Sequence, residues 1–270
     1  MTAPRTILTA WIDGIGLMGP GLPDWPTARS ILAGNAAYAF SPTLAPPPQS
    51  LPPAERRRTG LSVKVALAVA QEAIAAGQLD PRQLATVFAS SGADGDNCDA
   101  ICQVLASDDR HISPTRFHNS VHNAPAGYWG IAAGAMTPAT VLCVYDGCFG
   151  AGLLEALTQV AAEGNSTLLI AYDAPYPEPL HAARPLPAAM GLALALMPQQ
   201  SAQSLARIQV SLSDAEPDVL ADTGLDALRR AIPAARGLPV LQALARGEAR
   251  QVVLDYLEPL RLAVVVEPCR

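Results

Sequence analysis

An apolar stretch that turns abruptly into a helix dominates the middle of this chain. Ala139 to Val144 has the small and apolar residues of a buried strand, and Gly150 to Glu163 has the pattern of a helix. Only the short turn Tyr145 to Phe149, YDGCF, separates the two. Several α/β enzymes present a nucleophile in such a turn, because the helix dipole there favours an anion. The turn therefore predicts an α/β fold and singles out Asp146 and Cys148 for chemistry.

Strands and helices alternate on both sides of this turn. We expect strands at Ile7 to Ile12, Thr86 to Ala89, Ser166 to Tyr172, Ala188 to Met197, Ile208 to Leu212 (an edge or hairpin strand) and Arg261 to Val266. We expect helices at Gly60 to Ala76, around Cys98 and Cys102 with Asp96 or Asn97 as the cap, at Asn123 to Gly134, Gly224 to Ala231 and Leu238 to Ala245, and loops at 41–53 and Ser113 to His118. This alternation predicts a layered α/β sheet with helices on both faces.

Length and composition suit one large domain in a reducing compartment. The chain has 270 residues, half of them hydrophobic, which can supply a sizeable core. We expect a domain over residues 1–200 and an extension over residues 201–270 that completes or covers it. The absence of a secretory pattern or a membrane-length apolar run, together with an odd number of cysteines, predicts a cytoplasmic protein without membrane contact.

The charge balance argues against a nucleic-acid partner. The net charge is −6, and Lys64 is the only lysine, so no basic track is available for a phosphate backbone. The one basic cluster is Arg56 to Arg58. It is interpreted first as a solvated helix start, with contact to an acidic carrier protein or a partner subunit as the alternative.

A glycine motif near the N-terminus matches the dinucleotide-binding pattern formally. Gly14 to Gly19 reads G-x-G-x-x-G after the first expected strand. A dinucleotide site needs a helix immediately after the motif, whereas Pro20, Pro23 and Pro26 are expected to interrupt one. We therefore interpret the motif as a glycine-rich turn that ends a buried strand, with nucleotide binding as the weaker alternative, and expect no cofactor.

Cys98 and Cys102 lie four residues apart on one helical face, a spacing that suits two metal ligands. No second pair of cysteines or histidines follows at the spacing of a zinc finger. We therefore expect both side chains to face the core as small apolar groups, and expect no metal.

Several short motifs together carry a family resemblance. They are Gly-x-Gly-x-x-x-Pro (Gly14, Gly16, Pro20), a Leu-Pro-Pro-x-Glu-Arg-Arg-Arg run (Leu51 to Arg58), Ser113-Pro114, Asn-x-x-Ala-Gly (Asn123, Ala126, Gly127) and a strand led by Pro138. In this order they resemble the N-terminal half of β-ketoacyl synthases over residues 5–200. The resemblance implies a truncated thiolase-like fold and a role in fatty-acid or polyketide synthesis.

Two departures from active synthases bear on function. By ungapped alignment from Ser113, the position of the nucleophilic cysteine holds Asp146, and Cys148 lies two residues later. Active synthases also use a histidine pair from their C-terminal half, but this chain has no histidine after His181. The resemblance therefore implies a catalytically silent subunit of the chain-length-factor type, and no catalytic residue is assigned with certainty.

The alternative is a stand-alone enzyme. In it, Cys148 would accept an acyl group with His118 or His122 as the base, giving an acyltransferase or a thioesterase-like activity. The other interpretations of the two histidines are a structural role and contact with a partner or an acyl chain.

The runs His118 to Gly127 and Ala151 to Ala156 resemble the short synthase-like proteins of aryl polyene and xanthomonadin-type pigment clusters. This likeness implies a heterodimer with an active ketosynthase, which would bring in the acyl carrier protein; a homodimer is the other possibility. The interface would use the strand residues Ala139, Val141, Cys143 and Val144, and the acyl tunnel of the partner would be approached by Arg116 and Ser120.

Overall fold

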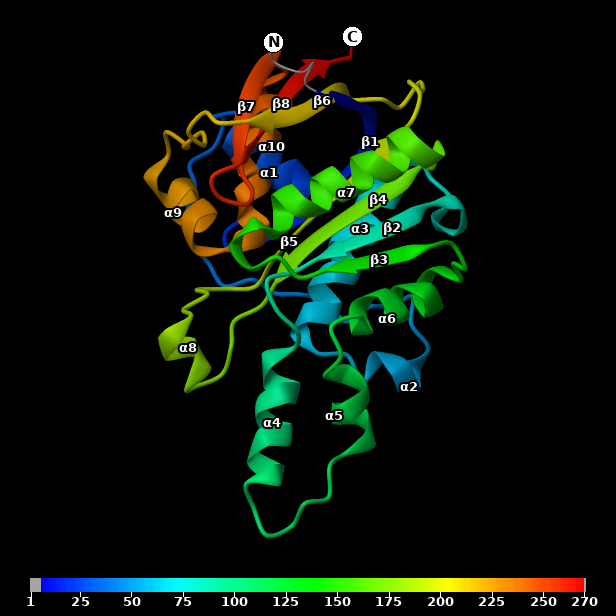
Figure 1. Cartoon of the computed structure of the whole chain (residues 1–270), viewed down its shortest axis with the longest axis vertical. Coiled ribbons are helices and arrows are strands. Elements are labelled where there is room, and N and C mark those ends of the chain that lie inside the picture. The colour runs from blue at the N-terminus through cyan, green and yellow to red at the C-terminus, as the bar shows by residue number, and fades with distance from the viewer. Residues whose placement is uncertain (1–5, 270) are drawn as a thin grey trace.

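The computed structural model describes residues 6–269, and its centre is an eight-stranded mixed sheet (Figure 1). The strand order is β3-β2-β4-β5-β1-β6-β8-β7. β2 pairs in parallel with β3 and β4, and the other neighbours are antiparallel. The strands are β1 (Leu8–Met18), β2 (Ala85–Ala89), β3 (Ala139–Leu142), β4 (Thr167–Asp173), β5 (Met190–Met197), β6 (Ala206–Ser213), β7 (Arg250–Asp255) and β8 (Arg261–Pro268).

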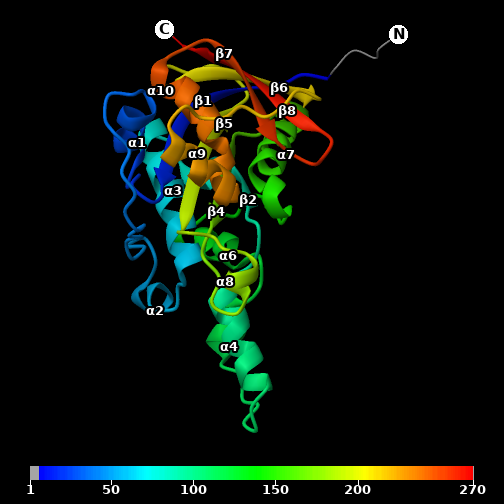
Figure 2. The same ribbon diagram turned by 90° about the vertical axis from the view of Figure 1, so that its left-hand side faces the viewer.

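Helices cover both faces of the sheet, which confirms the expected layers. α3 and α6 pack on one face, and α7 and α10 pack on the other; Figure 2 shows α3 and α7 on opposite sides of the strands. The helices are α1 (Trp25–Leu32), α2 (Pro53–Arg56), α3 (Leu61–Gly77), α4 (Gly95–Leu105), α5 (Pro114–Asn119), α6 (Ala124–Ala133), α7 (Cys148–Glu163), α8 (Leu180–Ala183), α9 (Thr223–Ala231) and α10 (Leu238–Arg246), with short 3₁₀ turns η1 (Pro81–Gln83), η2 (Tyr145–Gly147) and η3 (Pro233–Gly237).

Most of the glycine motif lies inside a strand, and only Gly19 belongs to the turn that was expected for the whole motif. β1 continues through Gly14 and Gly16 to Met18. A Cβ atom on Gly14 would lie 2.1 Å from the Ala73 carbonyl oxygen of α3, and one on Gly16 would lie 1.9 Å from the Val69 oxygen. The two glycines therefore let a helix backbone approach the strand closely.

A helix does follow the motif, contrary to the expectation from the prolines. α1 accommodates Pro26 in its first turn, where a missing N–H costs nothing, and Asp24 caps it by accepting a hydrogen bond of 2.8 Å from the Thr27 N–H. Since the glycines belong to β1 and not to the start of α1, the nucleotide-binding interpretation has no structural basis.

Several other elements differ from the expectations in type, place or cap. β6 is an inner strand between β1 and β8, not an edge, and β7 was not expected at all. The segment Ser113 to His118 was expected to be a loop, but most of it forms α5, with Pro114 in its first turn. α4 is capped by Asp94, not by Asp96 or Asn97.

Residues after 200 contribute to the same sheet. β6 pairs with β1, β8 pairs with β6, and β7 closes that end of the sheet. α10 packs beneath these strands within the larger of the two apolar clusters. The segment thus supplies β6, β8 and β7, which follow β1 in this order across the sheet.

A helical hairpin projects from the body. α4 and α5 run side by side away from the sheet in Figure 1, and α4 also projects from the body in Figure 2. α4 has no buried residue. Among residues 6–269, no helix combines the length and apolar character that crossing a membrane requires.

The close approach of α3 to β1 yields a stability prediction. We expect Gly16→Ala to lower the free energy of unfolding by about 3 kcal/mol, because the new methyl group collides with helix backbone and not with a movable side chain. Urea unfolding would measure the loss.

The matched control is Gly127→Ala in α6, where an added Cβ meets no atom within 4 Å. We expect this variant to be as stable as the wild type or more stable by about 0.5–1 kcal/mol. Equal stability of the Gly16→Ala variant and the wild type would contradict the packing argument.

Candidate functional site

The turn between β3 and α7 has a tight and partly strained geometry. β3 ends at Leu142, Val144 is followed by the 3₁₀ turn η2, and α7 begins at Cys148. Within the turn Tyr145 has a φ of 48°, in the left-handed region that side chains disfavour. The turn therefore has the abrupt strand-to-helix character that the sequence predicted, with Cys148 and not Asp146 in the first helical position.

Asp146 forms ion pairs with two arginines. Its Oδ1 lies 2.8 Å from Nη2 of Arg184, and its Oδ2 lies 3.2 Å from Nη2 of Arg236. Both arginine side chains are largely buried, whereas 44% of the Asp146 side chain is exposed. The carboxylate is thus neutralised by two cations that come from later in the chain.

These ion pairs continue into the C-terminal segment. Arg236 also lies 3.5 Å from Asp255, the last residue of β7, and Arg229 of α9 lies 3.3 Å from the same carboxylate. The backbone of the turn also approaches the C-terminal segment, since a Cβ on Gly147 would lie 2.7 Å from the Tyr256 oxygen. The end of β7 therefore packs directly on the turn.

The Cys148 thiol is fully buried and engaged. It accepts a hydrogen bond from the Val144 N–H at 3.1 Å and donates one to the Tyr145 oxygen at 2.9 Å. Burial raises the pKa of the thiol to about 12, and the bond from Val144 offsets only part of this. A thiolate is the reactive form, so this geometry does not provide a nucleophile.

The two candidate bases lie apart from the thiol. His118 is an exposed residue of α5 whose ring contacts Tyr128 edge-on, with 6.1 Å between ring centroids. His122 precedes α6, and burial lowers its pKa, with a backbone hydrogen bond at Ser90 acting in the opposite sense. Among the described residues, neither histidine is hydrogen-bonded to Cys148. The enzyme alternative is therefore not favoured.

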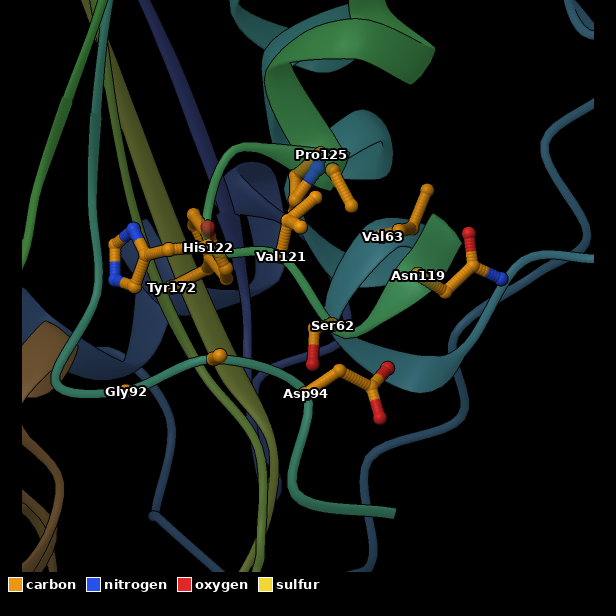
Figure 3. Close-up of a pocket in the computed structure, with 11 residues that line it drawn as sticks. Ser62, Val63, Gly92, Asp94, Asn119, Val121, His122, Pro125 and Tyr172 are labelled. Carbon is orange, nitrogen blue, oxygen red and sulfur yellow. The ribbon is translucent and has the colours of Figure 1, made fainter. Parts of the chain in front are cut away.

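His122 borders a small cavity at the base of the α4–α5 hairpin (Figure 3). Ser62 and Asp94 lie near one end of the cavity and the His122 ring near the other. The volume is about 10 Å³, which has room for about one water molecule. The cavity is too small for an acyl chain.

The two predicted tunnel residues lie on or beside α5. Arg116 is exposed, without an ion pair among residues 6–269. Ser120 is half-buried; its hydroxyl donates to the Phe117 oxygen at 2.9 Å, and its carbonyl accepts a long contact of 3.9 Å from the Cys98 thiol. Arg116 thus lies on the hairpin itself, and Ser120 lies at the end of α5 where the chain returns to the body.

β3 is an edge strand with one open side. The Thr86 N–H donates to the Pro138 oxygen at 3.0 Å, and the Ser90 N–H donates to the Leu142 oxygen at 3.2 Å. Alternate residues of a strand direct their backbone groups to opposite sides. The backbone groups of Ala139, Val141 and Cys143 therefore face away from β2.

The predicted interface residues are only partly covered. Ala139 and Cys143 are exposed, and Val141 and Val144 are half-buried. Cys143 has one polar contact, 3.4 Å from its thiol to the Ser91 oxygen. β3 therefore combines free backbone groups with accessible side chains.

The other edge of the sheet is blocked by the chain itself. The Val253 N–H of β7 donates to the Asp218 carboxylate at 2.7 Å, and the Asp218 N–H donates to the Val253 oxygen at 2.9 Å. Arg250 holds the same carboxylate at 2.7 Å. Only the β3 edge of this sheet is left without such a cap.

The expectation that Cys98 and Cys102 face the core is wrong. They lie on the projecting α4, where Cys98 is half-buried and Cys102 is exposed. Within the described part of the chain, no three His, Cys, Asp or Glu side chains gather as metal ligands would.

A buried carboxylate beneath the turn was not expected. Asp173, at the end of β4, accepts hydrogen bonds from the Ser91 N–H and hydroxyl at 2.9 and 2.6 Å and from the Ala234 N–H at 2.8 Å. Burial raises its pKa to about 6, which these bonds only partly oppose. The sequence signal that could have indicated this buried carboxylate is an aspartate directly after a buried apolar strand.

Family and structural comparisons agree with this geometry. Residues 33–255 match the family model described as the β-ketoacyl synthase N-terminal domain, so the match continues beyond residue 200. No curated protein sequence matches the chain.

Solved structures confirm the ketosynthase-like fold. A ketosynthase (ApeO) in complex with its chain length factor (ApeC) from Xenorhabdus doucetiae aligns at a TM-score of 0.72 and 22% identity, over 96% of this chain and 99% of that one. An acyl-carrier protein complex with its type II ketosynthase, AntDE:AntF, gives 0.74 and 11%, over 98% and 100%. The ishigamide ketosynthase/chain length factor gives 0.68 and 13%, over 97% and 100%.

The environment of Cys148 predicts an inert thiol. We expect iodoacetamide at pH 7.5 to alkylate the exposed Cys102 and Cys143 in the native protein at least about tenfold faster than Cys148, because reaction requires an accessible thiolate. Mass spectrometry of the digested protein gives the rates. In urea all three should react alike; rapid native labelling of Cys148 would restore the enzyme alternative.

Asp173 predicts a pH dependence of stability. Its pKa is higher in the folded chain than in the unfolded chain, so the folded state binds the proton more tightly and stability from this group is lost as pH rises from about 4 to about 6. We expect the unfolding free energy of the wild type, relative to that of Asp173→Asn, to fall across this window and to level off above about pH 7. A difference that stays constant from pH 4 to 7 would contradict the assignment.

Proposed function

Since the chain belongs to the β-ketoacyl synthase N-terminal domain family, we propose that it is a catalytically silent subunit of the chain-length-factor type that pairs with an active ketosynthase. The proposal rests on two neighbouring features: β3 is an open edge of the sheet, and the turn from β3 into α7 has no usable nucleophile. The first provides for assembly, and the second removes independent chemistry.

Silence is supported by the turn itself. Condensation by this family requires an acyl thioester, and Cys148 is buried with a pKa raised to about 12. Asp146 cannot form a thioester, and its two arginine partners hold it in place. The chain also has no histidine beyond His181 to serve as a catalytic pair. The stand-alone acyltransferase or thioesterase is disfavoured for the same reasons.

Pairing is supported by the β3 edge and its surroundings. Free backbone groups on an edge strand form a template for another strand. Large apolar side chains are exposed nearby in sequence: Phe117, Val121, Ile131 and Met136, at 64%, 46%, 51% and 97%. Exposed apolar groups of this size are typical of a surface that another protein covers. Ketosynthase and chain length factor occur together in two of the similar structures.

The proposed pairing also assigns roles to residues of this chain near the partner's acyl tunnel. We propose that Arg116 on α5 and Ser120 at the end of α5 approach the partner's acyl tunnel, and that the acyl carrier protein binds through the partner. A similar structure contains an acyl-carrier protein with its ketosynthase. The resemblance of the runs His118 to Gly127 and Ala151 to Ala156 to short synthase-like proteins of aryl polyene clusters supports a polyene acyl chain. We further propose that residues 201–270 complete the domain, since they supply β6, β7 and β8.

The edge can be tested with proline. We expect Val141→Pro to abolish co-purification of this chain with an active ketosynthase of the same organism, because the substitution removes an outward N–H and leaves every hydrogen bond to β2 in place. Co-expression followed by size-exclusion chromatography with light scattering measures the complex.

Gln251→Pro is the matched control, because this exposed residue of β7 also directs its N–H outward but lies on the capped edge. It should leave a one-to-one complex. The proposal fails if the wild type forms no complex, or if it becomes acylated and condenses acyl groups without a partner.

A further inference from the structure

An apolar groove lies between α3 and α6, on the face of the sheet away from α7. Its volume is about 310 Å³, which is at the lower end of the range of small-molecule sites. Its lining residues belong neither to β3 nor to the turn into α7, so the groove is separate from the site described above. Most of the lining is aliphatic and includes Ile74, Leu79, Ala132 and Ala133.

Trp129 of α6 gives this groove an unsatisfied polar group. The side chain lines the groove and is 3% exposed, and its Nε1 has no hydrogen-bond partner among residues 6–269. Five other side chains of the described chain have an unpartnered buried nitrogen, but each is less buried and has a second nitrogen. The indole N–H is the only polar group of its side chain. A buried donor left without an acceptor is costly and calls for an explanation.

The rest of the lining determines the charge of a ligand. Among the described residues, no titratable side chain lines the groove, and the polar ones are Ser50, Gln71 and Gln78. The Gln71 amide donates a hydrogen bond to the Ser50 hydroxyl. A carboxylate or an ammonium group would therefore lose water here without gaining an opposite charge. The groove thus favours a neutral ligand with an apolar body and a hydrogen-bond acceptor.

We propose that this groove binds a small neutral carbonyl compound, whose apolar body lies on the aliphatic residues and whose oxygen accepts a hydrogen bond from Trp129 Nε1. A carbonyl oxygen supplies the acceptor without adding a donor that the apolar lining would leave unpaired. The nitrogen is covered in the free chain, so binding requires a side chain at the rim of the groove to move. The site belongs to this chain alone and does not depend on pairing with a ketosynthase.

The test uses the full chain without a partner, labelled with ¹⁵N in its tryptophan side chains, and the aromatic ketone butyrophenone as the probe. The chain has three tryptophans, and the indole signal that is lost in Trp129→Phe belongs to Trp129. We expect butyrophenone to shift this signal saturably, with a dissociation constant below about 1 mM. The signals of Trp11 and Trp25 should stay in place.

Two analogues of the probe separate the parts of the proposal. The charged 4-phenylbutyrate should bind at least about tenfold more weakly than butyrophenone, because no cation lines the groove. In ligand-observed NMR, Trp129→Phe should bind butyrophenone about threefold to tenfold more weakly than the wild type does. Butylbenzene lacks the oxygen and should bind both proteins equally.

Ala133→Leu fills the groove with a residue that suits a helix, and should abolish the shift. Gly127→Ala is the matched control, because it lies on the same helix outside the groove and should leave the affinity unchanged. The proposal is overturned if butyrophenone leaves the Trp129 signal unmoved, if 4-phenylbutyrate binds as tightly, or if the shift persists in Ala133→Leu. A signal that moves with protein concentration alone would assign the groove to a second copy of the chain, and would also overturn it.

Discussion

The contact between helix α3 and the central strand β1 is the constraint on which the layered arrangement depends. Gly14 and Gly16 bring the strand against the carbonyl groups of Ala73 and Val69, closer than any side chain allows. Glu72 of the same helix accepts hydrogen bonds from the Leu17 N–H and the Trp25 N–H, so α3 also fixes the chain between β1 and α1. β5 and β6 pair with β1 on its two sides, and the remaining strands lie farther out.

Much of this fold could be predicted from the sequence, because the long apolar segments have a clear period. α3, α7 and β5 were predicted within a few residues, and the alternation gave the layers correctly. The glycine motif was misread because glycine is favoured both in a turn and in a strand that packs closely against a helix. α1 and α5 were missed because a proline in a first helical turn looks like an interruption. β7 begins with two exposed polar residues and carries little periodicity.

The candidate site was predictable in place but not in chemistry. Local sequence located the strand and the turn into the helix, because both are continuous segments, and the family resemblance implied that this strand has an exposed edge. The partners of Asp146 are Arg184 and Arg236, which lie far along the chain, and no local pattern relates them. The burial of Cys148 depends on the later segment folding back onto the turn. Properties that arise from such distant contacts require the structure.

The Asp218 cap on β7 has a consequence for stoichiometry. A sheet that could accept a strand at both ends would allow chains to join into open arrays, and aggregation would grow with concentration. Here the outward backbone groups of Val253 at the β7 end are already bonded to Asp218, so this end accepts another strand less readily than β3 does. Association through β3 alone would then join two chains and would not build a filament.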